Sequence, residues 1–262
     1  MAETELDVYP LREPRRLHLE WLLPMIFRPA RTLREIFEAE KPSWLTPLVL
    51  LSLLALVMVV AGGPVRVQAA QIPAEPPEDF QWWSPEQQEQ YFQNQAGRAG
   101  PLFTYVFPAV RAVGGLWVGW FLLGALLHLG LTLAGSRSSS TNAFNLAAWA
   151  SVPFAIRYLV QTVYIFATHQ LIENPGLSGL LLDASARLPL FARLVLAGVD
   201  LYVIWRLALL LVGVNLMSNL PRARAAVITL AVVVILLALQ ALPSFGLSQI
   251  SGLSTVRPFF FF

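Results

Sequence analysis

Three charged residues, Arg157, Asp200 and Arg206, lie inside long apolar stretches of the sequence. If these stretches cross a bilayer, a charge near the membrane centre costs roughly 2.5–3.5 kcal/mol, so it is usually paired or part of a proton or ion pathway. Asp200 is the only acid in these stretches, which argues against a relay of carboxylates. Arg206 lies about 240° round the same helix from Asp200, a poor position for pairing with it. We therefore predict a structural charge pair between Arg157 and Asp200, with an ion pathway as the alternative.

Sequence motifs typical of catalysis are absent. The chain contains no HExxH, no GxSxG and no glycine-rich phosphate loop. It has no cysteine, which excludes disulfides and thiolate ligands, and its three histidines, His18, His128 and His169, lie far apart. We therefore expect no enzyme activity, no catalytic residue, no cofactor and no metal site. His128 is expected to hydrogen-bond a neighbouring helix.

The elements that must position the charges are membrane-spanning helices. Hydrophobic residues make up 56% of the 262 positions and charged residues only 13%, against roughly a quarter charged in a soluble domain. A transmembrane helix needs about 20 mostly apolar residues, and five stretches approach that length. We predict an all-α, polytopic membrane bundle of five transmembrane helices, with Gly62-Gly63-Pro64 ending the first and Pro243 ending the last. The predicted spans are Trp44–Ala61, a part of Leu102–Ala134, Ala143–Ala167, Leu190–Met217 and Ala225–Leu242.

Arginine and lysine are distributed unevenly between the links, which predicts orientation. One side would carry Arg12, Arg15, Arg16, Arg28, Arg31, Arg34, Lys41, Arg137, Arg222 and Arg224. The other side would carry Arg66, Arg98, Arg187 and Arg257, with Arg111 and Arg193 near span ends. We expect a cytoplasmic amino terminus and an outer carboxyl terminus in a prokaryotic cytoplasmic membrane. The net charge of +2 is too small to indicate a nucleic-acid partner.

The predicted organisation is an amino-terminal cytoplasmic segment (1–43), a membrane domain (44–243) with an outer loop (62–100), and an extracytoplasmic tail (244–262). In the first segment, Leu33, Ile36 and Phe37 share one helical face, and Thr32 with Glu35 matches a capping box. This pattern predicts an amphipathic helix lying on the cytoplasmic membrane surface.

A second short helix is predicted in the outer loop. Ser84 is a typical cap and Pro85 suits the first helical position. The Gln-rich body that follows, together with Trp82 and Trp83, is suited to the level of the lipid headgroups. The tail ends in four phenylalanines, which could anchor at the outer interface, dock on a partner or stay disordered.

Small residues at helical spacing mark a face of the second span that would allow close helix contact. Gly115 and Gly119 form a GxxxG, and Gly130 with Ala134 repeats the spacing. We expect these residues to pack inside the bundle, with dimerisation as the alternative.

The order of these features resembles the Yip family, five-span membrane proteins named for their interaction with Rab-type (Ypt) GTPases, and in particular its bacterial members. The similar stretches are Phe27–Ile36 before Trp44–Pro47, then Leu126–His128, Ala147–Phe154 and Asp200–Val214. The most family-like single positions are Pro153, Asp200, Trp205 and Gly213. The resemblance implies five spans, a cytoplasmic amino terminus, no known catalysis and a role in membrane organisation through partners.

The leading hypothesis is therefore a non-enzymatic membrane scaffold or accessory subunit. It would contact the lipid bilayer and pack against another membrane protein or a second copy of itself. The amino-terminal region is short for GTPase recruitment, so a Rab-type GTPase is not the expected partner. The alternative is a small permease or transporter component, although transporters usually show two related halves and none is visible here. An intramembrane hydrolase would need a nucleophile with a base or metal ligands, and the spans contain no such set.

Overall fold

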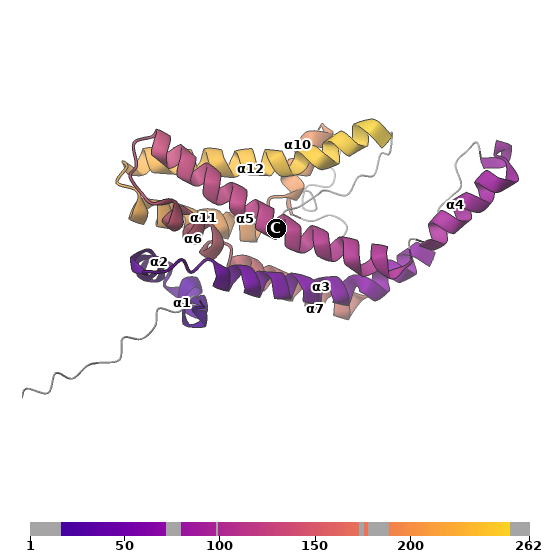
Figure 1. The fold of residues 1–262 in the computed structure, drawn as a ribbon, viewed down its shortest axis with the longest axis horizontal. Coiled ribbons are helices and arrows are strands. Elements are labelled where there is room, and N and C mark those ends of the chain that lie inside the picture. The colour runs from indigo at the N-terminus through magenta and orange to yellow at the C-terminus, as the bar shows by residue number, and fades with distance from the viewer. Residues whose placement is uncertain (1–16, 72–79, 98, 173–175, 178–188, 252–262) are drawn as a thin grey trace, which may run out of the picture.

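The long apolar stretches form helices that run along one common axis (Figure 1). The computed structural model describes residues 17–71, 80–97, 99–172, 176–177 and 189–251, and in this part of the chain all regular structure is helical. The central helix α5 (Phe107–Leu133) contacts α3 (Leu45–Gln71) on one side and α12 (Arg222–Ser251) on the other. The remaining spanning segments are α6 (Ser140–Trp149) with α7 (Pro153–Thr168), and α10 (Leu190–Ala197) with α11 (Leu201–Met217).

Four helical stretches among the described residues are long and apolar enough to cross a membrane, and the α10–α11 pair makes a fifth if it is counted as one span. The predicted all-α bundle of membrane helices is thus confirmed. The pair α10–α11 is bent by 71° at its break. The predicted fourth span, Leu190–Met217, is therefore broken, because the chain leaves the helix between Gly198 and Asp200.

Two predicted stop signals do not end their helices. Helix α3 continues through Gly62-Gly63-Pro64 to Gln71, and α12 continues through Pro243 to Ser251. A proline removes one donor from the helical ladder and is tolerated where other groups satisfy the freed carbonyls. Pro64 cannot donate to the carbonyl of Val60, four residues earlier, and the neighbouring Val59 carbonyl accepts from Arg66 Nη1 at 2.9 Å, so a side-chain donor lies close to the interruption. The first half of the predicted tail is therefore helical, and residues 252–262, with the four phenylalanines, lie outside the described residues.

The second and third spans are also irregular. A short π-helix, η3 (Leu102–Val106), leads directly into α5. The turn at 150–152 separates α6 from α7, where Pro153 occupies the first helical position with its fixed φ and missing donor. These breaks place irregular backbone within the apolar part of the sequence, where each freed polar group needs a partner inside the protein.

The apolar face of the amphipathic helix α2 (Pro29–Glu38) packs on protein, so the predicted contact of this face with lipid is wrong. Leu33 and Ile36 are fully buried, and α2 contacts α6 and α11. The predicted capping box is also wrong, because the helix already begins at Pro29 and the Thr32 hydroxyl donates to the Arg28 carbonyl. The apolar face of α2 thus belongs to the core of the bundle.

The outer-loop helix α4 (Pro85–Gly97) begins as predicted, with the Ser84 hydroxyl accepting from the Gln87 backbone N–H at 3.3 Å. Together with η2 (Phe80–Trp82) it extends away from the bundle beyond the end of α3 (Figure 1). Its aromatic side chains gather on Phe80, which lies 5.3 Å from Tyr91 and 5.6 Å from Phe92. This arm does not cover the end of the bundle from which it extends (Figure 1).

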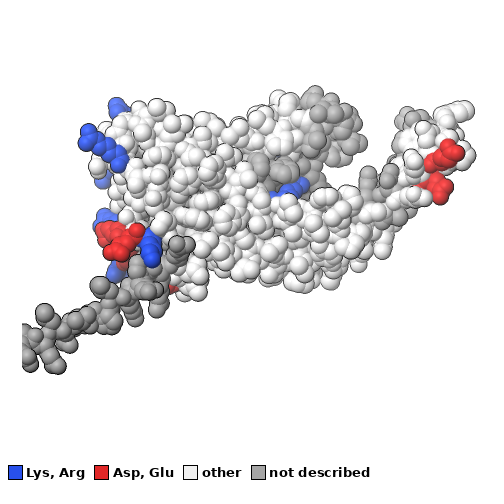
Figure 2. Space-filling model, viewed as in Figure 1, with Lys and Arg blue, Asp and Glu red and all other residues white. Residues whose placement is uncertain are grey.

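Charged side chains gather at the two ends of the molecule and leave the surface between them nearly uncharged (Figure 2). Such a distribution fits a belt surrounded by lipid with polar ends in water. The arm formed by η2 and α4 contributes exposed Glu86 and Glu89. The opposite end, where α2 and the α5–α6 and α11–α12 links lie, exposes Arg28, Arg31, Arg34, Lys41, Arg137, Arg222 and Arg224.

Glycines allow close contact between the helices. A side chain at Gly124 would run into Phe144 of α6, and one at Gly213 would run into Leu146. Of the predicted packing residues, Gly115 and Gly119 are buried, while a side chain at Gly130 would meet Ile228 of α12 at 2.9 Å. Ala134 ends α5 and is only partly buried.

Candidate functional site

Two polar clusters inside the bundle are the candidates for a functional site. The first, here called the charged junction, consists of Phe154, Arg157, Asp200 and Arg206. The second, here called the amino-terminal cluster, consists of His18, Ser43, Thr46, Asn145 and Trp149.

In the charged junction, α7 presents Phe154 and Arg157 on one face, since residues three apart are neighbours on a helix. Both are buried, and Tyr158 on the same face is also buried. Pro153 begins the helix one residue earlier and so determines where this face starts. Sequence reasoning missed Phe154, although an aromatic residue one turn before an intramembrane arginine is a recognisable signal.

Asp200 sits at the break between α10 and α11 and performs two tasks there. Its Oδ1 atom accepts a hydrogen bond from the Val203 backbone N–H at 2.9 Å, which caps the first turn of α11. Its Oδ2 atom lies 3.3 Å from Arg157 Nε. A carboxylate at a helix amino terminus is also favoured by the helix dipole. The structure therefore brings Arg157 and Asp200 together, but with Asp200 at a helix start instead of within a continuous span.

Arg206 also lies close to the ring of Phe154. The guanidinium carbons of Arg206 and Arg157 lie 5.3 and 5.7 Å from the centre of the Phe154 ring. Cations at such distances from an aromatic face are attracted by its quadrupole, more strongly when water is excluded. Arg206 also lines a small, mainly apolar pocket between α5, α11 and α12, with Leu123, Val203 and Val233 among its neighbours.

Gly176 and Leu177 pack against the break between α10 and α11. Leu177 donates its backbone N–H to the Val199 carbonyl at 2.8 Å. Gly176 has φ of +67°, and a side chain there would lie 2.6 Å from the carbonyl oxygens of Ala197 and Val199. Only glycine fits both this conformation and this contact.

The amino-terminal cluster attaches the segment just before α3 to helix α6. Asn145 Oδ1 accepts from the backbone N–H groups of Ser43 and Trp44 at 3.0 and 3.1 Å. Trp149 Nε1 donates to the Ser43 hydroxyl at 2.9 Å. Asn145, Ser43 and Trp149 are all buried, so these neutral bonds lie away from water. Sequence reasoning missed this set, for which the only signal was an asparagine between apolar residues.

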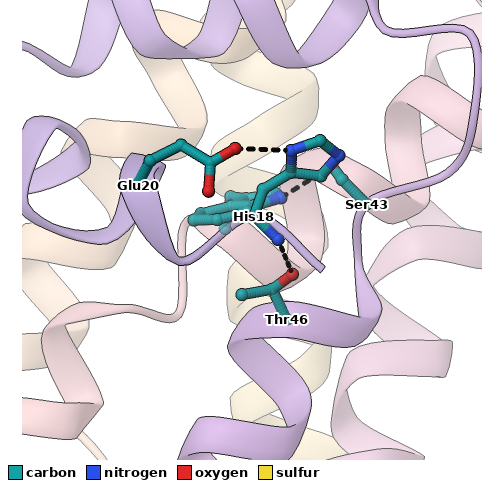
Figure 3. A network of polar contacts seen from close by, with 5 residues as sticks. His18, Glu20, Ser43 and Thr46 are labelled. Carbon is teal, nitrogen blue, oxygen red and sulfur yellow. Dashed lines mark hydrogen bonds and ion pairs between the residues drawn. The ribbon is translucent and has the colours of Figure 1, made fainter. Parts of the chain in front are cut away.

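His18 belongs to this second cluster. Its backbone N–H donates to Thr46 Oγ1 at 2.9 Å, and its Nδ1 lies 2.9 Å from the Glu20 carboxylate (Figure 3). Its ring stacks on Trp21, whose indole meets Trp149 edge-on. The other two histidines are elsewhere: His169 is exposed at the end of α7, and the buried Nδ1 of His128 makes no hydrogen bond to the described residues. The expected interhelical bond of His128 is thus not seen at that atom.

A family model for the Yip1 domain matches residues 24–242, which is most of the chain. The chain belongs to the Yip1 family. No curated protein and no solved structure matches it significantly. Together with the apolar helices, membership makes it a multi-pass membrane protein of that family.

The family-like positions of this Yip1-family protein have identifiable structural tasks. Pro153 starts α7 and Asp200 caps α11, while Gly213 lets α11 approach Leu146. Trp205 is partly buried against the main hydrophobic core. Each of the four positions therefore acts on helix packing or on a helix end.

Proposed function

We propose that this Yip1-family protein is a non-enzymatic scaffold or accessory subunit that packs against another membrane protein or a second copy of itself. The observation that carries the proposal is the direction of its intramembrane charges. Arg157 and Arg206 are both turned inward onto Phe154, and Asp200 pairs with Arg157 while capping a helix. Because these groups stabilise contacts between helices, they support a structural role.

The outward faces of the helices are the surfaces available to a membrane partner. On α7, Val163 and Phe166 are about two-thirds exposed, and Val227 of α12 is similarly exposed. Helix association in lipid depends on close packing of such faces and on hydrogen bonds, because lipid tails are as apolar as the side chains. A scaffold would use one of these faces for protein and leave the others to lipid.

Site-specific photo-crosslinking in native membranes tests this distinction. A photoreactive amino acid would replace Val163 on α7, Val57 on α3 or Val227 on α12, three exposed positions on different helices. A scaffold predicts one discrete protein adduct, or a dimer of the chain, from one face and lipid adducts from the others. Lipid adducts at all three positions, together with solute transport by the purified protein in liposomes, would overturn the proposal.

We also propose that the amino terminus is cytoplasmic. Seven of the eight exposed arginines and lysines of the described chain gather at the end that contains α2, with Arg193 of α10 as the exception, and this bias is the one that the positive-inside rule expects of a cytoplasmic side. Because the sequence contains no cysteine, single cysteines can report topology. A cysteine at exposed Thr141 should be protected from an impermeant reagent added outside, while one at exposed Gln90 should react. The reverse pattern would invert the proposed orientation.

The alternative, a small permease or transporter component, is favoured by the broken α10–α11 span. Transporters commonly place binding sites at discontinuous helices, with the ends of half-helices facing the solute. Here Asp200, the cap of α11, lies beside Arg157, and a basic patch is visible within a recess of the surface (Figure 2). Liposome uptake of small anions that is lost in Arg206→Gln would favour this alternative.

A further inference from the structure

The segment before α2 has two apolar faces, and the bundle uses only one of them. This segment comprises η1 (Leu19–Trp21) and α1 (Leu22–Phe27). Met25 is fully buried, and Trp21, Leu22 and Ile26 pack against the hydrophobic core. The opposite face is formed by Leu19, Leu23 and Phe27, which are 67%, 69% and 76% exposed.

Leu23 and Phe27 share one face of α1, since they are four residues apart, and exposed Leu19 of η1 precedes them in the chain. We call Leu19, Leu23 and Phe27 the outer stripe. Single exposed apolar residues are normal on a protein surface, but contiguous ones mark a contact with another molecule or with a membrane.

The position of the segment along the membrane normal is determined by the amino-terminal cluster. The His18 backbone N–H donates to Thr46 Oγ1 in the first turn of α3, the helix that forms the first span. The outer stripe therefore begins at the level where the first span enters the membrane. Figure 1 shows α1 at the margin of the bundle, beside the start of α3.

We propose that the outer stripe inserts into the boundary between headgroups and acyl chains of the leaflet at this end. Its occupant is the lipid surface, because the stripe is apolar and is held beside the first turn of α3, the helix that forms the first span. Interfacial helices bury their apolar face about 5–10 Å into this boundary. The outer stripe thus takes the interfacial role that the sequence suggested for Leu33, Ile36 and Phe37.

The insertion depends on apolar area more than on charge. The nearby bases Arg28, Arg31, Arg34 and Lys41 are matched in number by the nearby acids Glu20, Glu35, Glu38 and Glu40. Binding driven by basic residues would weaken as salt screens the attraction to anionic lipid. Binding driven by the outer stripe should be insensitive to salt and should occur in zwitterionic lipid.

Depth-dependent fluorescence quenching of the full chain tests the proposal. Single cysteines at Leu23 and Phe27 would carry an environment-sensitive fluorophore, with Leu19→Cys as a further site and exposed Glu38→Cys on α2 as the matched control. The protein would be reconstituted in zwitterionic vesicles containing lipids with spin labels at defined depths. We expect blue-shifted emission and several-fold stronger quenching at the three stripe positions than at Glu38, unchanged at high salt.

Two outcomes would overturn the proposal. Quenching at Leu23 and Phe27 equal to that at Glu38, with full access to aqueous iodide, would place the stripe in water. Shielding that appears only at high protein density, or a cross-link between copies through these positions, would mean that protein covers the stripe.

Discussion

The amino-terminal cluster and the charged junction have the same structural role but use different kinds of interaction. Each attaches a non-helical stretch of chain to the bundle. In the amino-terminal cluster, Asn145 and Trp149 of α6 hold Ser43 through neutral hydrogen bonds. In the charged junction, Arg157 holds the break before α11 through the Asp200 carboxylate.

The difference matters most when one partner is removed. A buried neutral donor left without its acceptor costs roughly 1–3 kcal/mol. Breaking a buried ion pair costs roughly 3–5 kcal/mol, because the remaining charge is uncompensated. We therefore expect the charged junction to be the more sensitive region, even though the amino-terminal cluster contains more bonds.

The largest effect is expected from splitting the charge pair. Arg157→Gln or Asp200→Ala should each lower the free energy of unfolding by up to roughly 3–5 kcal/mol, and the double variant should lose less than the sum. Thermal unfolding in detergent measures all three. Asp200→Asn separates the two tasks of Asp200, since asparagine also caps helices, and should be milder than Asp200→Ala by about 1 kcal/mol. Additive losses would show that Arg157 and Asp200 are not coupled and would return Asp200 to consideration as part of an ion pathway.

The next largest effect is expected at Gly176, compared with Gly135 in the α5–α6 link. Both have positive φ, +67° and +95°, but only Gly176 is crowded by backbone carbonyls. Alanine at either position should cost roughly 1–2 kcal/mol for its backbone conformation, and at Gly176 roughly 1–3 kcal/mol more for displacing the break. Thermal unfolding of Gly176→Ala and Gly135→Ala gives the difference. Equal losses would mean that the contact of Gly176 with Ala197 and Val199 contributes nothing.

The smallest of the three effects is expected from Asn145→Ala in the amino-terminal cluster. It leaves the buried N–H groups of Ser43 and Trp44 without their acceptor and should cost roughly 1–3 kcal/mol. The same variant should increase amide hydrogen exchange in α1 and α2 before it does so in α11. Asn142→Ala is the control, because Asn142 on the same helix bonds Ser139 through its backbone N–H. A loss at Asn145 larger than that at Arg157 would reverse the ranking of the two regions.

Local patterns predicted the helical elements well and their ends poorly. The spans follow from apolar length, and the cap at Ser84 follows from its own side chain. The stops expected at Pro64 and Pro243 were wrong because a proline removes one hydrogen bond from a long helix, and the rest of the helix and its surroundings can tolerate that loss. Arg66 donates to the Val59 carbonyl, next to the carbonyl that Pro64 leaves free, and the sequence alone does not reveal that geometry.

The candidate site was predicted only in part for a related reason. Arg157 and Asp200 were recognisable because charges are conspicuous in an apolar sequence. Phe154 and Asn145 do not stand out in the sequence. Only the folded chain places Arg206 near the Phe154 ring and the Ser43 backbone N–H against the Asn145 amide oxygen. The break before Asp200 was also hidden, since Leu190–Met217 is as apolar as a straight span.

The sequence by itself determined that this chain is a bundle of membrane helices with charged ends, because apolar length and the cost of burying charge act locally along the chain. Tertiary structure alone decided which apolar faces are covered. Two faces near the amino terminus, that of α2 and the outer stripe, have the same character in the sequence, yet Leu33 is fully buried and Phe27 is 76% exposed. Protein interior and lipid are both apolar surroundings, so hydrophobicity does not distinguish them, and only packing against α6 and α11 assigns the face of α2 to the core.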